Sequence, residues 1–195
     1  MSSPLPHKTL VINTVGEPGS GKTTLSFWLA QSLKKSGVLV EFVPELVKYE
    51  CFDPQGQARV RSGKFDFRYL ALQHRLLRPL LGRVEVVVND GAYELFYFYA
   101  KRRMEPSSLQ RFRQTIDELQ RSLPSGSENW FVMPRRNHPY ERVGRNESED
   151  EAKIVRDQMT TCLADDFGVQ VIPINDEADR ILLLESILKR VGQLQ

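Results

Sequence analysis

Short apolar runs alternate along the chain with longer stretches whose apolar residues recur at helical spacing. The short runs are rich in Val and Ile, which is typical of buried strands. They are Leu10–Val15, Val38–Val43, Val84–Asn89, Trp130–Met133 and Val169–Ile174. The helical stretches are Thr23–Lys35, Phe67–Leu81, Ala92–Arg103, Ser107–Ser122, Glu149–Asp166 and Glu177–Val191. This alternation predicts an α/β fold with a mostly parallel five-stranded sheet and helices on both faces.

Two stretches interrupt the alternation. Phe52–Lys64 is rich in Gly, Gln and Arg, and we expect a mobile loop there. The segment 134–147 is highly charged, follows the fourth predicted strand and precedes a helix. That place in the chain suits a lid over a nucleotide site, although a solvated charged loop is an alternative interpretation.

Composition narrows the class of protein. A length of 195 residues fits a single domain, residues 1–195. The only two cysteines, Cys51 and Cys162, lack metal-ligand spacing, so we expect neither a disulfide framework nor an oxidising compartment, and a cytoplasmic location is predicted. No apolar run approaches the ~20 residues that span a bilayer, and Met1–His7 lacks the apolar core of a signal peptide, so no membrane partner is expected. A net charge of +2 neither requires nor excludes a nucleic-acid partner.

The strongest motif follows the first predicted strand and opens the first predicted helix. It has the Walker A pattern Gly-x-x-x-x-Gly-Lys-Thr, whose backbone N–H groups bind phosphate. Lys22 is expected to bridge the β- and γ-phosphates, and the Thr23 hydroxyl to bind Mg²⁺. A Gly-rich hairpin turn is the structural alternative. The residues expected to bind ATP are Gly16, Glu17, Pro18, Gly19, Ser20, Gly21, Lys22, Thr23 and Thr24.

Two carboxylates follow neighbouring strands and extend this site. Asp90 ends the third predicted strand, where it could orient Mg²⁺ or act as a base; a simple Asp-Gly turn with Gly91 is the alternative. Glu45 ends the second strand, where it could take a proton from an acceptor hydroxyl; a helix N-terminal Glu is the alternative. Sequence reasoning leaves open which of the two is the general base.

Arginines and aromatic residues supply candidates for the rest of a transfer site. Arg136 and Arg145, in the charged segment, are the candidates for stabilising the transferring phosphoryl group. Gln73 could read a base edge, or simply be a surface glutamine. Between Tyr93 and Arg103 aromatic residues lead into three consecutive basic ones, a composition that suits a nucleotide or DNA surface as well as a partly buried helix with a basic end. The acceptor-binding candidates are Gln73, Tyr93, Lys101, Arg102 and Arg103.

These motifs resemble the small P-loop kinases of bacteriophages, which are related to nicotinamide riboside kinases and deoxynucleoside kinases. The resemblance extends over nearly the whole chain and rests on Gly16–Thr24, Val40–Glu45, Gln73, Asn89–Asp90 and the segment 136–147. It implies that Glu45 is the catalytic base and that Gln73 reads the acceptor. The chain departs from deoxynucleoside kinases after the third strand, where Asp90-Gly91-Ala92 replaces their Asp/Glu-Arg-Ser motif. The Asp-Arg pair of thymidylate kinases is also missing.

The sequence therefore predicts an enzyme, a kinase that uses Mg·ATP to phosphorylate a hydroxyl of a nucleoside-like acceptor. The resemblance implies one specific acceptor, 5-hydroxymethyluracil in phage DNA, which would place the protein in the host cytoplasm. A free nucleoside or nucleotide is the alternative acceptor. An NTP-hydrolysing switch is the alternative from another class, although the chain lacks the Asn-Lys-x-Asp pattern of GTPases. Sequence reasoning identifies neither the oligomeric state nor the preference for ATP over other donors.

Overall fold

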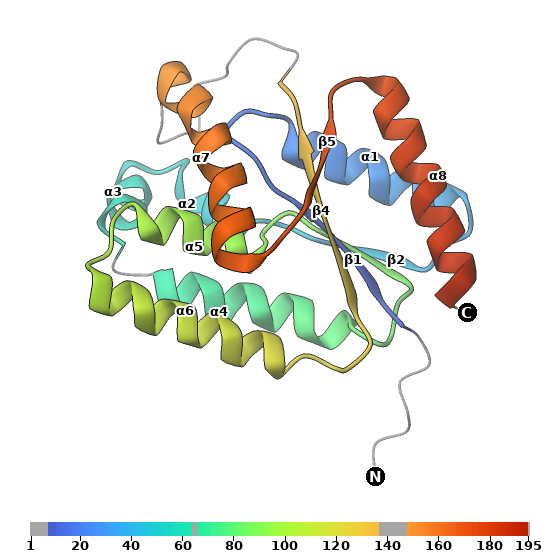
Figure 1. The fold of residues 1–195 in the computed structure, drawn as a ribbon, viewed down its shortest axis with the longest axis horizontal. Helices are drawn as coiled ribbons and strands as arrows, with labels where there is room; N and C mark the ends of the chain where they lie inside the picture. The colour runs from blue at the N-terminus through green and yellow to red at the C-terminus, as the bar shows by residue number, and fades with distance from the viewer. Residues whose placement is uncertain (1–7, 64–65, 137–147, 195) are drawn as a thin grey trace.

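Five parallel strands form a single sheet at the centre of the described structure (Figure 1). The structure is a computed structural model that describes residues 8–63, 66–136 and 148–194. The strands are β1 (Leu10–Thr14), β2 (Val40–Val43), β3 (Val86–Asn89), β4 (Glu128–Pro134) and β5 (Val171–Ile174). Their order is β2-β3-β1-β4-β5, and every neighbouring pair is parallel. The predicted α/β architecture is confirmed.

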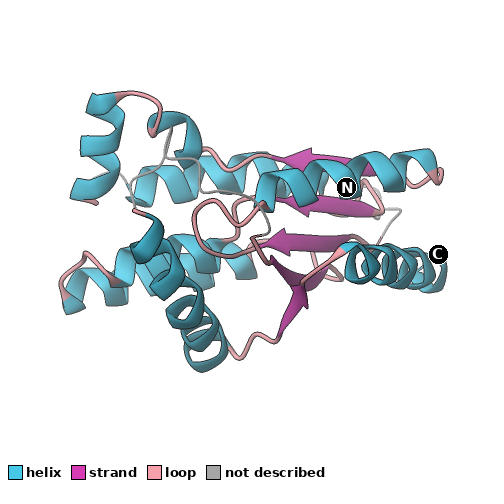
Figure 2. Ribbon diagram, turned by 90° about the horizontal axis from the view of Figure 1, so that it is seen from above, coloured by secondary structure: helices cyan, strands magenta, loops and turns pink. Residues whose placement is uncertain are grey.

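Helices cover both faces of this sheet, as Figure 2 shows from above. They are α1 (Lys22–Lys35), α2 (Val47–Glu50), α3 (Pro54–Ser62), α4 (Asp66–Leu77), the 3₁₀ turn η1 (Arg78–Leu80), α5 (Tyr93–Lys101), α6 (Pro106–Arg121), α7 (Glu149–Phe167) and α8 (Glu177–Leu194). Alternate strand residues point to opposite faces. Leu10 and Ile12 pack against α1 and α8, whereas Val11 packs in the core beneath α4, α5, α6 and α7.

The region around residues 52–64 differs from the expected loop, because it contains helix α3. Asp53 caps the helix, its side chain accepting a hydrogen bond from the Gly56 N–H at 2.7 Å, and Pro54 occupies the first turn. Arg59 forms an ion pair with Glu50 of α2 at 2.6 Å. A Cβ on Gly56 would lie 2.0 Å from the Glu50 carbonyl oxygen, so this glycine serves close packing between two helices. Gly and Gln content was therefore a misleading signal here.

The fourth helix ends earlier than its apolar spacing predicts. Arg78–Leu80 form a 3₁₀ turn because Pro79 has no N–H to continue the α-helical pattern. Of the predicted lid, 134–147, the structure describes Pro134 at the end of β4, Arg135 and Arg136; residues 137–147 lie outside the described part. Among the described helices, none combines the length and apolar character that a membrane crossing requires.

Candidate functional site

The loop between β1 and α1 has the backbone shape of a phosphate-binding loop. Gly16, Gly19 and Gly21 adopt positive φ angles of 139°, 76° and 94°, a region that residues with a Cβ rarely occupy. At Gly16, an added Cβ would also lie 3.1 Å from the Ser20 Oγ. The loop therefore depends on its glycines for a turn that brings successive backbone N–H groups to the start of α1.

Lys22 lies folded over this loop. Its Nζ donates hydrogen bonds to the carbonyl oxygens of Gly16 and Glu17, both at 3.0 Å. The ammonium group is thus held at the loop itself, without an ion pair to a carboxylate in the described part of the chain. In this position its charge is available to the phosphates that the loop would bind.

A buried carboxylate lies beside the loop. Asp90 follows β3 and is 1% exposed. Its Oδ2 accepts a hydrogen bond from Thr23 Oγ1 at 2.6 Å, and its Oδ1 accepts one from Thr14 Oγ1 at 2.7 Å. The structure thus brings the two predicted metal ligands, Thr23 and Asp90, into contact. Thr14, the last residue of β1, was missed by sequence reasoning, although a polar residue ending a buried strand is a usable signal.

The residues present fit Mg·ATP. Hydroxyl and carboxylate oxygens are the ligands that Mg²⁺ prefers, and Thr23 and Asp90 supply one of each. Among the described residues, the buried Ser20 Oγ has no hydrogen-bond partner, and neither does Glu17 Oε2. An unpaired buried hydroxyl in a phosphate-binding loop suits a phosphate oxygen as its partner.

Two further basic residues border the loop, and sequence reasoning identified neither. Lys48 of α2 donates from Nζ to Thr23 Oγ1 at 3.1 Å, which places a positive charge beside the Thr23–Asp90 pair. Arg156 of α7 donates from Nη1 to Glu17 Oε1 at 3.4 Å and to the Pro134 carbonyl oxygen at 3.1 Å. Neither residue lies in a motif, so only the folded chain reveals them.

The loop that carries Glu45 is held next to Asp90. The Asp90 N–H donates to the Val43 carbonyl oxygen at 2.9 Å, joining the ends of β2 and β3, and Glu45 follows half-buried. Gln73 of α4 is fully buried, and its amide nitrogen donates to the Pro44 carbonyl oxygen at 3.1 Å. Its Oε1 accepts from the Leu46 N–H at 3.5 Å. Gln73 therefore holds the backbone on both sides of Glu45, while base reading by Gln73 stays a prediction.

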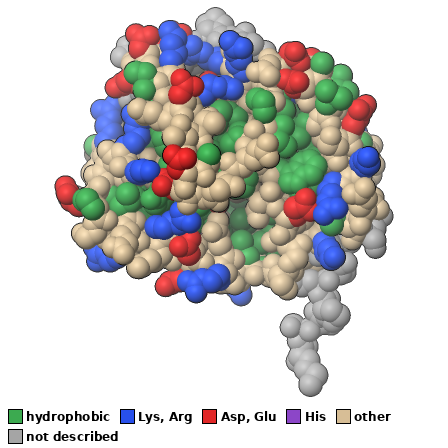
Figure 3. Space-filling view, viewed as in Figure 1, with side chains coloured by type: hydrophobic (Ala, Val, Ile, Leu, Met, Phe, Trp, Pro, Cys, Tyr) green, Lys and Arg blue, Asp and Glu red, His purple; other side chains and the backbone are tan. Residues whose placement is uncertain are grey.

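The other predicted acceptor residues lie at opposite ends of α5 and do not converge. The Tyr93 hydroxyl forms a hydrogen bond with His74 Nδ1 at 2.9 Å. At the far end, the basic residues contact helices α4 and α7: Lys101 pairs with Asp166 at 2.6 Å, Arg102 with Gln158 at 3.1 Å and Arg103 with Asp66 at 2.9 Å. Basic and acidic side chains are interspersed over the face that Figure 3 shows.

The predicted lid arginines are only partly covered by the structure. Arg136, two residues beyond β4, donates to Glu149 Oε1 at 2.7 Å and so links the end of β4 to the start of α7. Arg145 lies outside the described residues. Stabilisation of a phosphoryl group by either arginine stays a prediction.

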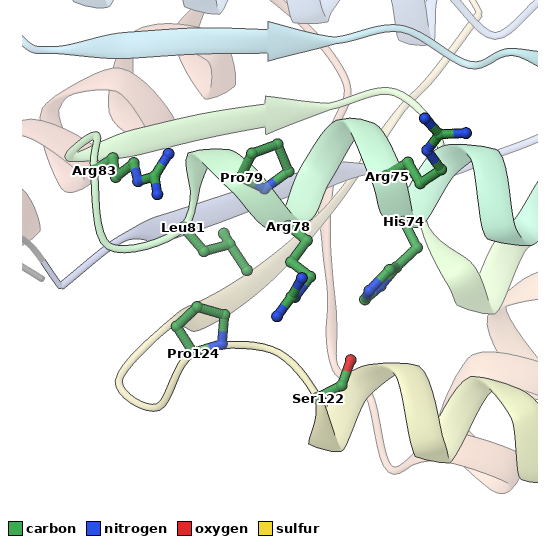
Figure 4. Close-up of a pocket in the computed structure, with 8 residues that line it drawn as sticks. All are labelled: His74, Arg75, Arg78, Pro79, Leu81, Arg83, Ser122 and Pro124. Atoms are coloured by element: carbon green, nitrogen blue, oxygen red, sulfur yellow. The ribbon is translucent and has the colours of Figure 1, made fainter. Parts of the chain in front are cut away.

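Two cavities lie between the ends of α4 and α6, away from the phosphate loop. The larger, about 690 Å³, is bordered by His74, Arg78 and Leu81, with Ser122 and Pro124 opposite them. Figure 4 shows His74 and Arg78 pointing towards the Ser122–Pro124 segment, whereas Arg75 points away. The smaller, about 300 Å³, lies against the sheet and shares Pro124 with the first.

Comparison with known proteins supports the fold assignment. No protein-family model matches this sequence, and no curated protein matches it. The structure is similar to the crystal structure of the NadR protein in complex with NR, with a TM-score of 0.62 and 16% sequence identity. The similarity covers 96% of this chain and 53% of that chain, so this chain spans about half the length of the other. At this identity the likeness shows the fold alone, which is a P-loop NTPase-like α/β fold.

Proposed function

We propose that this protein is a P-loop kinase that transfers the γ-phosphate of ATP to a hydroxyl of a nucleoside-like acceptor. The observation that carries the proposal is the Asp90 carboxylate, buried beside the phosphate loop and held by the hydroxyls of Thr14 and Thr23. The fold shared with the NadR protein, solved in complex with NR, is consistent with a small acceptor of this class.

Each side chain has a role in this reaction. The glycine-rich loop and Lys22 bind the phosphates, and the Ser20 hydroxyl donates to one phosphate oxygen. Thr23 and Asp90 would hold Mg²⁺, which neutralises charge on the β- and γ-phosphates when it is bound. Lys48, now donating to Thr23, adds positive charge on the acceptor side of the loop. Arg156 adds positive charge on the other side of the phosphate loop, where it donates a hydrogen bond to Glu17.

The chemical step needs a proton acceptor as well as charge stabilisation. The acceptor oxygen bonds to the γ-phosphorus as the bond from that phosphorus to the bridging oxygen of ADP breaks. Glu45 takes the proton of the acceptor hydroxyl, and ADP leaves with the electron pair of the broken bond. Gln73 positions the Glu45 loop by holding Pro44 and Leu46. A base that is anchored in this way loses little freedom when the acceptor binds.

The acceptor follows less directly from the geometry. Lys101, Arg102 and Arg103 already bind side chains of α4 and α7, an arrangement that favours a free nucleoside over DNA. Transfer to 5-hydroxymethyluracil within DNA is the more specific alternative. It requires these basic side chains to exchange their present partners for phosphates. If DNA is bound there, neutralising all three should weaken binding and reduce its salt dependence.

Incubation with γ-labelled ATP and Mg²⁺ tests the proposal. The acceptor panel contains free nucleosides, nucleotides, plain DNA and DNA with hydroxymethylated pyrimidines. Label on a nucleoside is the expected result, and label on the modified DNA would select the alternative acceptor. Release of phosphate without any labelled acceptor would refute the kinase proposal in favour of an ATPase.

Two variants separate binding from chemistry. Lys22→Ala should abolish transfer, and unchanged turnover would contradict the assignment of the phosphate site. Glu45→Gln should lower the rate by about 10²-fold or more while ATP affinity stays nearly constant, because general-base loss typically has this size. A large loss of ATP affinity in Glu45→Gln would instead assign that carboxylate to the metal.

A further inference from the structure

The 300 Å³ cavity is a polar pocket in a part of the core that is otherwise apolar. It lies between the sheet and the C-terminal ends of α4 and α6, and the turn 123–127 that leads into β4 borders it. Elsewhere this face of the sheet packs through Val11, Val87 and Phe131. Besides Tyr93, the polar residues bordering the cavity are Asn13, Asn89, Glu94, Gln120, Ser125, Ser127 and Asn129.

A chain of amide hydrogen bonds crosses three strands at this cavity. Asn89 Nδ2 donates to Asn13 Oδ1 at 2.8 Å, and Asn13 Nδ2 donates to Asn129 Oδ1 at 3.2 Å. At its inner end, Gln73 Nε2 donates to Asn89 Oδ1 at 3.2 Å. Every bond runs in the same direction, so the chain ends on the amide N–H groups of exposed Asn129. Within the described residues these N–H groups donate to no protein atom.

Glu94 provides hydrogen-bond acceptors at the cavity that the Asn129 N–H donors border. This carboxyl is 5% exposed, and Gln120 Nε2 donates to its Oε1 at 2.8 Å. No ion pair to Glu94 is formed in the part of the chain that the structure covers. Burial raises the pKa of the Glu94 carboxyl above its ordinary value. Its hydrogen-bond partners are neutral, the Glu94 backbone N–H and the Gln120 amide, and a buried carboxylate without an ion pair is costly unless a further partner binds it. The proposed transfer reaction does not use this residue.

We propose that this cavity binds a purine through a guanine-type edge. Guanine presents two neighbouring N–H donors, which suit the carboxylate of Glu94, and beside them a carbonyl oxygen, which suits the N–H groups of Asn129. The volume is sufficient, because 300 Å³ equals roughly ten water molecules at about 30 Å³ each, which leaves room for a purine ring system together with bound water. Leu77, Leu123 and Pro124 provide apolar surface for the ring faces.

This site is separate from the phosphate site, although the two are connected. Asn89 borders the cavity and directly precedes Asp90 in the chain. Gln73, the first donor at the inner end of the amide chain, holds the Glu45 loop. The cavity therefore offers a place where a second nucleobase could bind next to the strand end that carries the transfer chemistry.

The test uses 9-ethylguanine, which carries the guanine edge but has no ribose hydroxyl to accept a phosphate. Titration calorimetry should show binding to the wild-type protein in the absence of ATP. 9-Ethylhypoxanthine lacks the amino group and should bind at least about tenfold more weakly, since one lost charge-assisted hydrogen bond is about 1.5–3 kcal/mol. Equal affinity for the two compounds would overturn edge recognition, and no binding of 9-ethylguanine at millimolar concentration would overturn the site.

Three variants locate the binding. Glu94→Gln and Asn129→Asp should each weaken 9-ethylguanine binding at least about tenfold. Asp at position 129 can still accept from Asn13 but cannot donate to the purine, so the amide chain survives. Glu118→Gln, the same chemical change at an exposed position of α6, should bind like wild type. Unchanged binding in both cavity variants would refute the proposal, while phosphoryl transfer, measured separately, tests the proposed function independently.

Discussion

Gly91 follows Asp90 where the deoxynucleoside-kinase motif has an arginine, and the structure explains this departure. A Cβ on Gly91 would lie 2.6 Å from Gln73 Nε2 and 2.7 Å from Gln73 Cδ. Real Cβ atoms are essentially never found so close to another atom, so Gly91→Ala must displace the Gln73 side chain. That side chain is fully buried and held by Pro44 and Asn89, so it cannot simply swing into solvent.

The destabilisation can be estimated by two routes. If Gln73 stays in place, overpacking in a well-packed core typically costs about 1–3 kcal/mol. If Gln73 moves, the two hydrogen bonds from its amide nitrogen are lost, at about 0.5–1.5 kcal/mol each. Both routes predict that Gly91→Ala lowers the free energy of unfolding by about 1–3 kcal/mol. The Glu45 loop should lose its anchor in the second case.

Urea unfolding followed by circular dichroism measures this change. The matched control is Gly192→Ala, because a Cβ at this exposed position of α8 meets no atom within 4 Å. It should stabilise the protein by about 0.5–1 kcal/mol through helix propensity. In a Gln73→Ala background the Gly91→Ala penalty should shrink, because the overlapping atoms are gone. An unchanged penalty in that background, or no penalty in wild type, would refute the proposed overlap.

Three further predictions concern buried polar groups. Thr14→Val removes one hydrogen bond to the Asp90 carboxylate, so it should lower the free energy of unfolding by about 1.5–3 kcal/mol, measured by urea unfolding. It should also weaken Mg·ATP binding, measured by titration calorimetry. Burial raises the pKa of Glu94 in the folded protein, so the wild type loses free energy of unfolding as pH rises from about 4.5 through that raised pKa. Glu94→Gln lacks this loss, so its stability relative to wild type should increase over the same pH range, measured by urea unfolding. Arg103→Met leaves Asp66 buried without its ion pair and should lower the free energy of unfolding by about 3 kcal/mol at pH 7. The loss should be smaller at pH 5, because burial raises the pKa of the Asp66 carboxyl and makes it easier to protonate.

Conservative variants control these predictions. Thr14→Ser retains the hydroxyl and should behave like wild type. Glu118→Gln should leave the pH dependence of unfolding unchanged, because that side chain is exposed. Arg103→Lys retains the charge next to Asp66 and should recover part of the stability. A pH-independent loss in Arg103→Met would show that packing, rather than the charge on Asp66, dominates at this position.

Much of the candidate site could be predicted because its residues sit at fixed places in local motifs. The phosphate loop needs glycines at backbone positions with positive φ, and Gly16, Gly19 and Gly21 occupy them. Thr23 and Asp90, each predicted as a metal ligand, lie in contact because neighbouring parallel strands end at the same edge of a sheet. Lys48 and Arg156 escaped prediction because single charged residues on helices carry no motif.

The sequence by itself determined the five strands, the longer helices and the phosphate loop, because apolar spacing and backbone shape are local properties. Only the tertiary structure decided which side chains are already bound. Gln73, expected to read a base, holds the Glu45 loop, and the basic residues 101–103, expected to bind an acceptor, pair with α4 and α7. Helix α3 likewise depends on close packing of Gly56 against α2. These outcomes depend on contacts between residues far apart in the chain, and the spacing of residues along a sequence does not specify such hydrogen-bond partners.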